Sequence, residues 1–178
     1  MELYITDLAA YNEGQLVGRW VKLPLSEEKL SEAITEILSD GEFECQTDNH
    51  EEVFITDYES DISVGEYDDI YRLNKLAKIL EELDEHDLIK LKCLSHEGYN
   101  EKDVLDNGLE TYEVDIYDYR GNTSFTDTFE LLAQDFVDEG LFGEIPKSIQ
   151  NYIDYSAIAR DLRMDYTEFE TNIIGRVA

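Results

Sequence analysis

The sequence lacks positive charge over one long stretch. No lysine or arginine lies between Lys29 and Arg72, whereas fourteen aspartate and glutamate residues fall there. The whole chain has 43 acidic and 14 basic residues, a formal net charge of −29 at pH 7. Such a charge repels nucleic acid and anionic membranes and attracts basic protein surfaces. It therefore excludes the class of proteins that bind DNA or RNA through a basic patch.

Cysteine is scarce, and long apolar runs are missing. Cys45 and Cys93 are the only cysteines, too few for the disulfide framework of a small secreted domain. No stretch approaches the roughly 18 apolar residues that a membrane-spanning helix needs. The opening MELYITDLAAY has neither the basic region nor the apolar region of a secretion signal. We expect a cytoplasmic protein with reduced thiols.

The chain does contain enough apolar side chain for a core. Hydrophobic residues make up 42% of it and aromatic residues 11%, whereas a disordered acidic tail is poor in both. A net charge of this size makes the compact state repel itself and lowers its stability. The charge is therefore expected to serve a function. A solvated acidic surface, as in a salt-loving organism, is the alternative, but an even bias does not favour a stretch without basic residues.

Residues 1–62 predict a β-β-α-β module. Alternating residues in ELYITD and QLVGRWVKLP predict two antiparallel strands. Ser26 is the expected N-cap of a helix whose apolar face starts at Leu30 and which ends before Gly41. EVFITDYES predicts a third strand. This module has 16 acidic and 3 basic residues.

Residues 63–108 predict a helical middle module. DDIYRLNKLAKILEEL places its apolar residues on one helical stripe. HDLIKLKCL is ambiguous, because Ile89, Leu91 and Cys93 alternate with lysines as in a strand. Its helical neighbours favour a short helix. EKDVLDNG predicts a further helix that ends at Gly108.

Residues 109–178 predict a third module. TYEVDIYDY alternates as a strand does, and FTDTFELLAQDFVDEG predicts a helix closed by Gly140. MDYTEF and NIIGRV predict closing strands. The predicted fold class is α+β, with small antiparallel-sheet-plus-helix modules flanking a helical middle module. Residues expected in the core of the third module are Phe125, Phe129, Leu132, Ala133, Phe136, Val137, Leu141, Phe142 and Ile145.

Alternating carboxylates raise the question of calcium. Asp57, Glu59, Asp61 and Ser63 have the ligand spacing of an EF-hand loop. The sixth position of that loop is Ile62, where the sharp turn requires glycine, and the twelfth is an aspartate instead of a bidentate glutamate. We therefore assign no calcium site.

Zinc and enzymatic catalysis have as little support. Cys45 with His50 and Cys93 with His96 would form a Cys₂His₂ set, but the two halves lie in different predicted modules. We expect Cys93 to be a small buried hydrophobe and the histidines to be on the surface. The G-x-S-x-G, P-loop and H-E-x-x-H motifs are absent. We expect no enzyme, no catalytic residue, no metal and no cofactor; an enzyme with a carboxylate pair is the weakest alternative.

The charge itself can substitute for DNA. B-DNA carries about one negative charge per 1.7 Å of its axis, so a net charge of −29 matches roughly 15 base pairs or about 50 Å of duplex. An acidic surface of this kind can occupy the basic groove of a DNA-binding enzyme. It would do so without base readout, and would therefore act across sequence specificities.

Several segments resemble the ArdA family of antirestriction proteins. They are LYITDLAAYNEGQLVGRWVKL at the start, ITDYE and VGEYDDI in the middle, and LLAQDFVDEGLFGEIPKSIQNYIDYSAIARDL near the end. The combination of D-L-A-A-Y-N-x-G with Y-I-D-Y-x-A-x-A-R-D-L is specific, and the match covers most of the chain. LLAQDFVDEGLFGEIP resembles the segment called the antirestriction motif in that family.

The resemblance implies an elongated, three-domain DNA mimic that is encoded on mobile genetic elements, forms a homodimer and inhibits type I restriction–modification enzymes. The alternative is an acidic module for other basic nucleic-acid-binding proteins. The dimer is expected to pair through the 111–119 strand, with Tyr112, Val114 and Ile116 at the interface. The predicted phosphate mimics are Asp57, Glu59, Asp61, Glu66, Asp68, Asp69, Asp115, Asp118, Asp135, Asp138 and Glu139.

Overall fold

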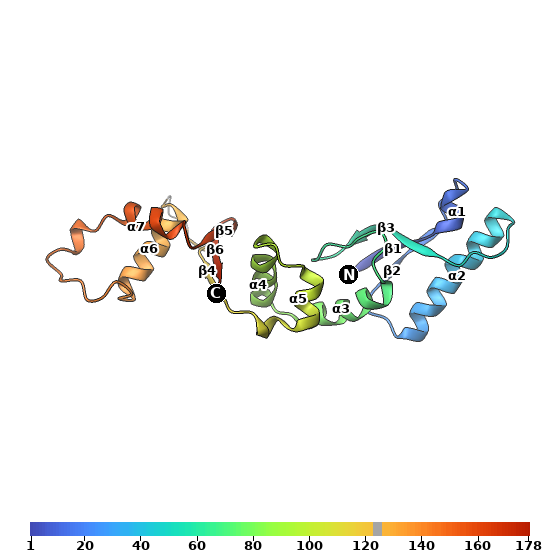
Figure 1. Cartoon of the computed structure of the whole chain (residues 1–178), viewed down its shortest axis with the longest axis horizontal. Coiled ribbons are helices and arrows are strands. Elements are labelled where there is room, and N and C mark those ends of the chain that lie inside the picture. Colours follow the sequence, from blue (N-terminus) through green and yellow to red (C-terminus); the bar gives the residue numbers. More distant parts are fainter. Residues whose placement is uncertain (123–125) are drawn as a thin grey trace. The chain divides into compact units, whose positions relative to one another are not determined.

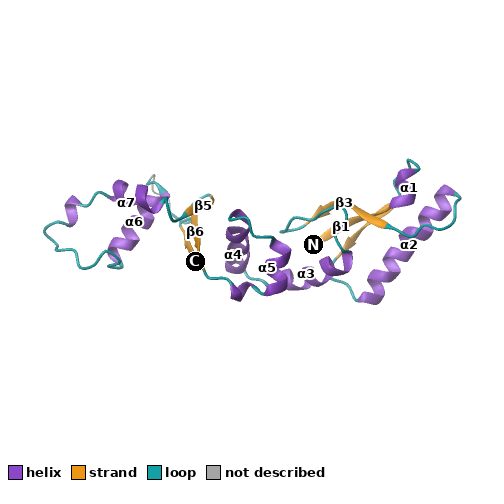
Figure 2. Cartoon of the chain, in the orientation of Figure 1, coloured by secondary structure: helices purple, strands orange, loops and turns teal. Residues whose placement is uncertain are grey.

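The computed structural model describes residues 1–122 and 126–178, and it divides into two compact units, Met1–Asp84 and Glu85–Ala178. Each unit has one three-stranded antiparallel sheet with helices packed on it (Figures 1 and 2). The predicted α+β fold class is therefore confirmed. The boundary between the units falls within residues 63–108, and a separate middle module stays a prediction.

The first unit is built on a sheet of order β2-β1-β3, with β1 (Glu2–Asp7) in the centre. β2 (Gly18–Lys22) and β3 (Val53–Glu59) both run antiparallel to β1, as the alternating patterns predict. Leu3 and Ile5 are fully buried on the face that packs against α2, and Tyr4 lies on the opposite face. The short helix α1 (Leu8–Asn12) follows β1 directly.

Helix α2 (Glu27–Cys45) packs against β1 and β2. Ser26 caps its start as predicted, accepting a hydrogen bond from the backbone N–H of Lys29. The prediction that the helix ends before Gly41 is wrong, because α2 continues to Cys45. Gly41 is a packing residue: a Cβ there would overlap the Asp7 carboxylate.

Helix α3 (Ile70–Glu82) completes the first unit. Leu73, Leu76 and Ala77 are buried on the predicted apolar stripe. The amide of Asn74 joins α3 to the segment just before α2. Its Oδ1 accepts a hydrogen bond from the N–H of Leu25 at 2.7 Å, and its Nδ2 donates to the carbonyl of Leu25 at 2.8 Å.

In the second unit, α4 (Glu85–His96) settles the ambiguity of HDLIKLKCL in favour of a helix. Ile89, Leu91, Cys93 and Leu94 are all buried, so apolar contacts surround much of this helix and blur its period. Helix α5 (Glu101–Asn107) ends at Gly108 as predicted, and the 3₁₀ turn η1 (Leu109–Thr111) follows.

The second sheet has the order β4-β6-β5. Its strands are β4 (Val114–Asp118), β5 (Thr167–Glu170) and β6 (Ile173–Val177), so both predicted closing strands are confirmed. Helices cover both faces. Gly175 faces α4, since a Cβ there would lie 2.6 Å from Cys93 Sγ, whereas its neighbour Ile174 packs on the other side with α6.

That other side holds the main core of the unit. Helix α6 (Thr128–Asp138), the 3₁₀ turn η2 (Gln150–Tyr152) and helix α7 (Tyr155–Leu162) come from the stretch between β4 and β5. The core cluster consists of Phe129, Leu132, Ala133, Phe136, Ala159, Tyr166 and Ile174. Burying each large apolar side chain stabilises the fold by roughly 1.5–3 kcal/mol.

The segment after α6 departs from the prediction. Leu141 and Phe142 were expected in the core, but they are 60% and 54% exposed. Gly140 adopts a left-handed conformation (φ 76°) at the end of α6, and the chain then leads away from the core, with Ile145 half-buried. Phe125 lies outside the described residues. None of the described helices combines the length and the apolar composition that crossing a membrane requires.

Candidate partner-binding surface

Acidic residues outnumber basic residues in both units. The first unit has 22 acidic and 6 basic residues, and the second has 21 and 8. The excess is therefore a property of each unit separately.

Several arginines neutralise carboxylates of their own chain. Arg19 on β2 contacts Glu36 and Asp40 on α2 at 2.5 Å each. Arg163 contacts Asp127 at 2.7 Å, and its guanidinium lies over the ring of Phe129. These basic groups are engaged within the molecule. The surplus of negative charge consequently falls on other carboxylates.

The predicted phosphate mimics of β3 and its following loop are exposed and uncompensated. Asp57, Glu59, Asp61 and Glu66 are all exposed. Asp57 accepts a hydrogen bond from the N–H of Tyr58 at 2.8 Å. The side chains of Glu59, Asp61 and Glu66 form neither an ion pair nor a hydrogen bond with the described residues. Asp57 and Glu59 share one face of the strand, roughly 7 Å apart.

One cross-strand pair places like charges together. Glu59 lies directly opposite Glu2 on β1, and Lys22 is opposite Glu2 on its other side. β3 is the edge strand, so Glu59 has no further strand beside it. Like charges directly opposite each other destabilise a sheet. This local cost favours a functional reason for the carboxylate at Glu59.

Asp68 and Asp69 have structural roles as well. Asp69 is the N-cap of α3 and accepts from the N–H of Tyr71 at 2.8 Å and of Arg72 at 3.3 Å. Asp68 Oδ2 accepts from the N–H of Gly65 at 2.7 Å. Both carboxylates thus help to hold the local backbone in place. Removing either one would therefore alter the loop as well as the charge.

In the second unit, two of the predicted mimics lie beside arginines. Asp115 accepts two hydrogen bonds from Arg176, at 2.5 and 3.1 Å. Asp118 contacts Arg120, and the hydrogen bonds from this arginine hold the pKa of Asp118 below its usual value. Arg120 also reaches Glu85 at 2.8 Å. Much of the negative charge at Asp115 and Asp118 is thus balanced locally.

The three predicted mimics on and after α6 are exposed, on the face that points away from the core. The hydroxyl of Tyr119 donates to Asp135 at 2.6 Å. Burial and this hydrogen bond both raise the pKa of Tyr119, so the proton stays on the tyrosine. Asp138 and Glu139 make no ion pair with any residue of the described ranges.

The sequence did not predict a buried pair that Asp7 forms with His50. His50 was expected on the surface but is 7% exposed, and its Nδ1 lies 2.5 Å from Oδ2 of the fully buried Asp7. Its Nε2 pairs with the hydroxyl of Thr47 at 2.9 Å. Asp7 Oδ1 also accepts from the N–H of Ala10 and caps α1. The expectations of a buried Cys93 and an exposed His96 are confirmed.

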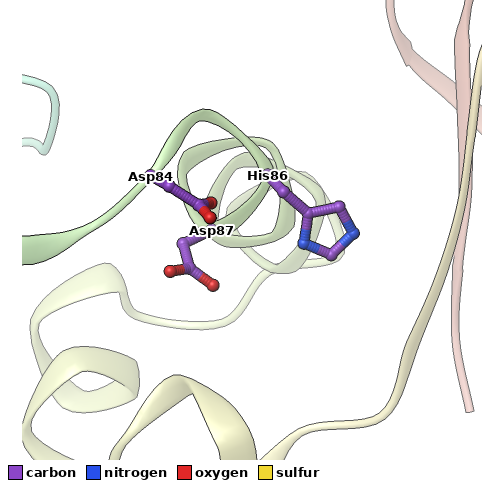
Figure 3. A group of neighbouring side chains, drawn as sticks. All are labelled: Asp84, His86 and Asp87. Atoms are coloured by element: carbon purple, nitrogen blue, oxygen red, sulfur yellow. The ribbon is translucent and has the colours of Figure 1, made fainter.

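Residues 1–122 and 126–178 offer few groupings of side chains that could coordinate a metal ion. Both ring nitrogens of His50 are already hydrogen-bonded, which opposes the zinc pairing with Cys45. Among the described residues, Asp84, His86 and Asp87 bring three ligand atoms within 4.8 Å of one another (Figure 3). A structural zinc site takes four ligands, and carboxylates gather at helix starts for electrostatic reasons alone. This group therefore supports no metal site.

Comparisons with known proteins give one clear result. A search of curated proteins found no match. The family profile described as "Antirestriction protein (ArdA)" matches residues 3–173, which is nearly the whole chain. The match includes all of β1 but its first residue, the acidic segment from β3 to α3, and α6. The chain therefore belongs to the ArdA family of antirestriction proteins.

Proposed function

We propose that this protein is a non-enzymatic DNA mimic that occupies the DNA-binding groove of type I restriction–modification enzymes and inhibits both restriction and modification. Family membership implies a restriction enzyme as the target. The observation that carries the proposal is the uncompensated acidic segment of β3 and its following loop, in a stretch of 42 residues (30–71) without lysine or arginine.

The carboxylates contribute unequally in this proposal. Glu59, Asp61, Glu66, Asp138 and Glu139 present free negative charge and are the principal phosphate mimics. Asp57, Asp69 and Asp135 also accept hydrogen bonds from groups of their own chain. Asp115 and Asp118 are balanced by arginines and contribute less, because an ion pair already formed must be weakened before a partner gains from it.

The experiment is an inhibition assay with a purified type I enzyme, measuring DNA cleavage and methylation separately. A mimic inhibits both activities, and excess duplex of any sequence relieves the inhibition. If inhibition persists at a saturating concentration of duplex, the protein and the DNA do not bind the same site on the enzyme. Equal inhibition of unrelated basic DNA-binding proteins would favour a general acidic binding module.

We further propose that the protein dimerises through the open edge of β4. Among the strands that the structure describes, β4 pairs only with β6. The carbonyl of Glu113 accepts from Ala178, and the N–H of Tyr119 donates to Asn172. Odd-numbered residues therefore bond to β6, and alternation directs the N–H and C=O of Val114 and Ile116 outward. Unpaired strand edges are templates for pairing with a second copy.

A proline substitution tests this edge without adding charge. Val114 and Ile116 are half-buried, and Ile116 lies opposite Gly175 on the face toward α4, so an aspartate there would also disturb packing. Ile116→Pro removes an outward N–H and is expected to yield folded monomers by light scattering. Tyr117→Pro, the matched control, removes an N–H bonded to β6 and is expected to unfold the sheet. A folded, dimeric Ile116→Pro variant would rule the edge out.

A further inference from the structure

A cavity of about 590 Å³ opens on the face of the first sheet that points away from α2. Five aromatic rings line it. Tyr4 and Trp20 meet edge to face with 5.5 Å between their centroids, Tyr11 and Phe54 do so at 5.1 Å, and Tyr67 stacks on Phe54 at 6.0 Å. We call this cavity the aromatic pocket.

The floor of the aromatic pocket is shaped by a glycine. A Cβ at Gly18 would lie 2.5 Å from the carbonyl oxygen of Ile5 and 2.9 Å from the ring of Tyr4. Without that Cβ, the Tyr4 ring can lie against β2, where its hydroxyl donates to the Gly18 carbonyl at 3.2 Å. The sheet below is further joined by a hydrogen bond between the hydroxyls of Thr6 and Thr56 at 2.7 Å. The floor is thus held in place by the strands.

The rings around this floor are more exposed than stability alone favours. Tyr67 is 75% exposed, Tyr11 51% and Trp20 44%. A gathering of exposed aromatic rings around one cavity is typical of a binding site. The loop that carries Tyr67 is fastened to the sheet by the N–H of Ile55, which donates to the carbonyl of Glu66 at 2.8 Å.

The charge of the aromatic pocket selects the ligand. Asp57 and Glu66 line it, and no basic residue does. Ring faces and carboxylates both attract cations, and a site that combines them favours a cation over a neutral or anionic group. A guanidinium stacks on aromatic planes and pairs with carboxylates in a planar fork, so arginine suits this site better than lysine.

We propose that the aromatic pocket binds an arginine side chain of the basic protein partner. The inference rests on the proposed function in that it takes the partner to be a protein with a basic surface. Mimicry of a DNA backbone supplies only negative charge. The pocket adds an anchored contact of the kind that dominates protein interfaces, an arginine desolvated among aromatic rings.

Trp20 reports on this pocket, because it is the only tryptophan in the chain. The probe is a blocked Gly-Arg-Gly peptide with a single positive charge, titrated while the fluorescence of Trp20 is recorded. The matched ligand replaces arginine with citrulline, which has nearly the same shape and no charge. We expect a saturable response to the arginine peptide and at least a fivefold weaker association of the citrulline peptide. Equal responses to the two peptides would overturn the proposal.

A pair of variants separates the pocket from general charge attraction. Tyr67→Ala removes one ring and no charge, and is expected to weaken binding of the arginine peptide about fivefold. Phe43→Ala is the control, since Phe43 on α2 is 80% exposed and does not line the pocket. It should bind as the wild type does. The proposal is contradicted if Tyr67→Ala binds the arginine peptide as tightly as the wild type does. It is also contradicted if Phe43→Ala loses as much affinity for the peptide as Tyr67→Ala.

This test is independent of any restriction enzyme. If the protein fails to displace DNA from a type I enzyme while the arginine peptide still binds, the proposed function is wrong and arginine binding by the aromatic pocket is supported. If the protein displaces DNA while the peptide does not bind, only the proposal of arginine binding is refuted. When both stand, Tyr67→Ala is expected to weaken displacement by a similar factor.

Discussion

Gly41 offers the most direct test of how the first unit is held together. Alanine normally stabilises a helix interior by about 1 kcal/mol relative to glycine. Here the added Cβ would overlap Oδ2 of Asp7 and stand 2.8 Å from Nδ1 of His50. Separating a buried, hydrogen-bonded pair of this kind costs about 3–5 kcal/mol. Gly41→Ala is therefore expected to lower the free energy of unfolding by about 2–4 kcal/mol, the sum of these opposing effects.

The assay is urea unfolding followed by the fluorescence of Trp20, which lies in the same unit. Ser39→Ala is the matched control, because Ser39 is exposed on the same helix and its substitution should change the unfolding free energy by less than about 0.5 kcal/mol. If Gly41→Ala is as stable as the wild type, the close approach of α2 to the Asp7–His50 pair does not constrain this position.

Two further predictions address the surface charge and the second core. The triple variant Asp57→Asn, Glu59→Gln, Asp61→Asn removes three charges and should weaken inhibition of a type I enzyme roughly tenfold at low salt and less at high salt. As the control, exchanging aspartate for glutamate and glutamate for aspartate at these positions keeps the charge and should retain inhibition. Burial raises the pKa of Tyr117 to about 12, whereas an unfolded tyrosine loses its proton near pH 10. The stabilisation from the protonated Tyr117 is therefore complete below pH 10 and is lost as the pH rises through 12. The urea midpoint should fall more steeply with rising pH for the wild type than for Tyr117→Phe.

Local patterns were enough to predict most of the elements. Amphipathic spacing identified α3 and α6, and alternation identified the strands that pair in each sheet. These signals are local, because one buried face imposes its period on consecutive residues. Gly41 shows the limit of such reasoning. A glycine after an apolar stripe usually ends a helix, but here its missing side chain makes room for residues from two other segments.

The features that sequence analysis missed are contacts between distant positions. Asp7 and His50 are 43 residues apart, and Asp115 and Arg176 are 61 apart. Nothing in the local pattern distinguishes a carboxylate that meets an arginine from one that stays free. The aromatic pocket is of the same kind, since its rings come from β1, α1, β2, β3 and the loop before α3. Composition predicted the acidic surface, whereas the fold determines which charges remain available.

The most direct test of DNA mimicry is a titration of this protein against a purified type I methyltransferase that holds labelled duplex DNA, repeated over a range of salt concentrations. We predict stoichiometric displacement of the duplex, with an affinity that falls steeply as salt screens the interaction between carboxylates and the basic groove. Failure to displace the duplex even at low salt would contradict the account.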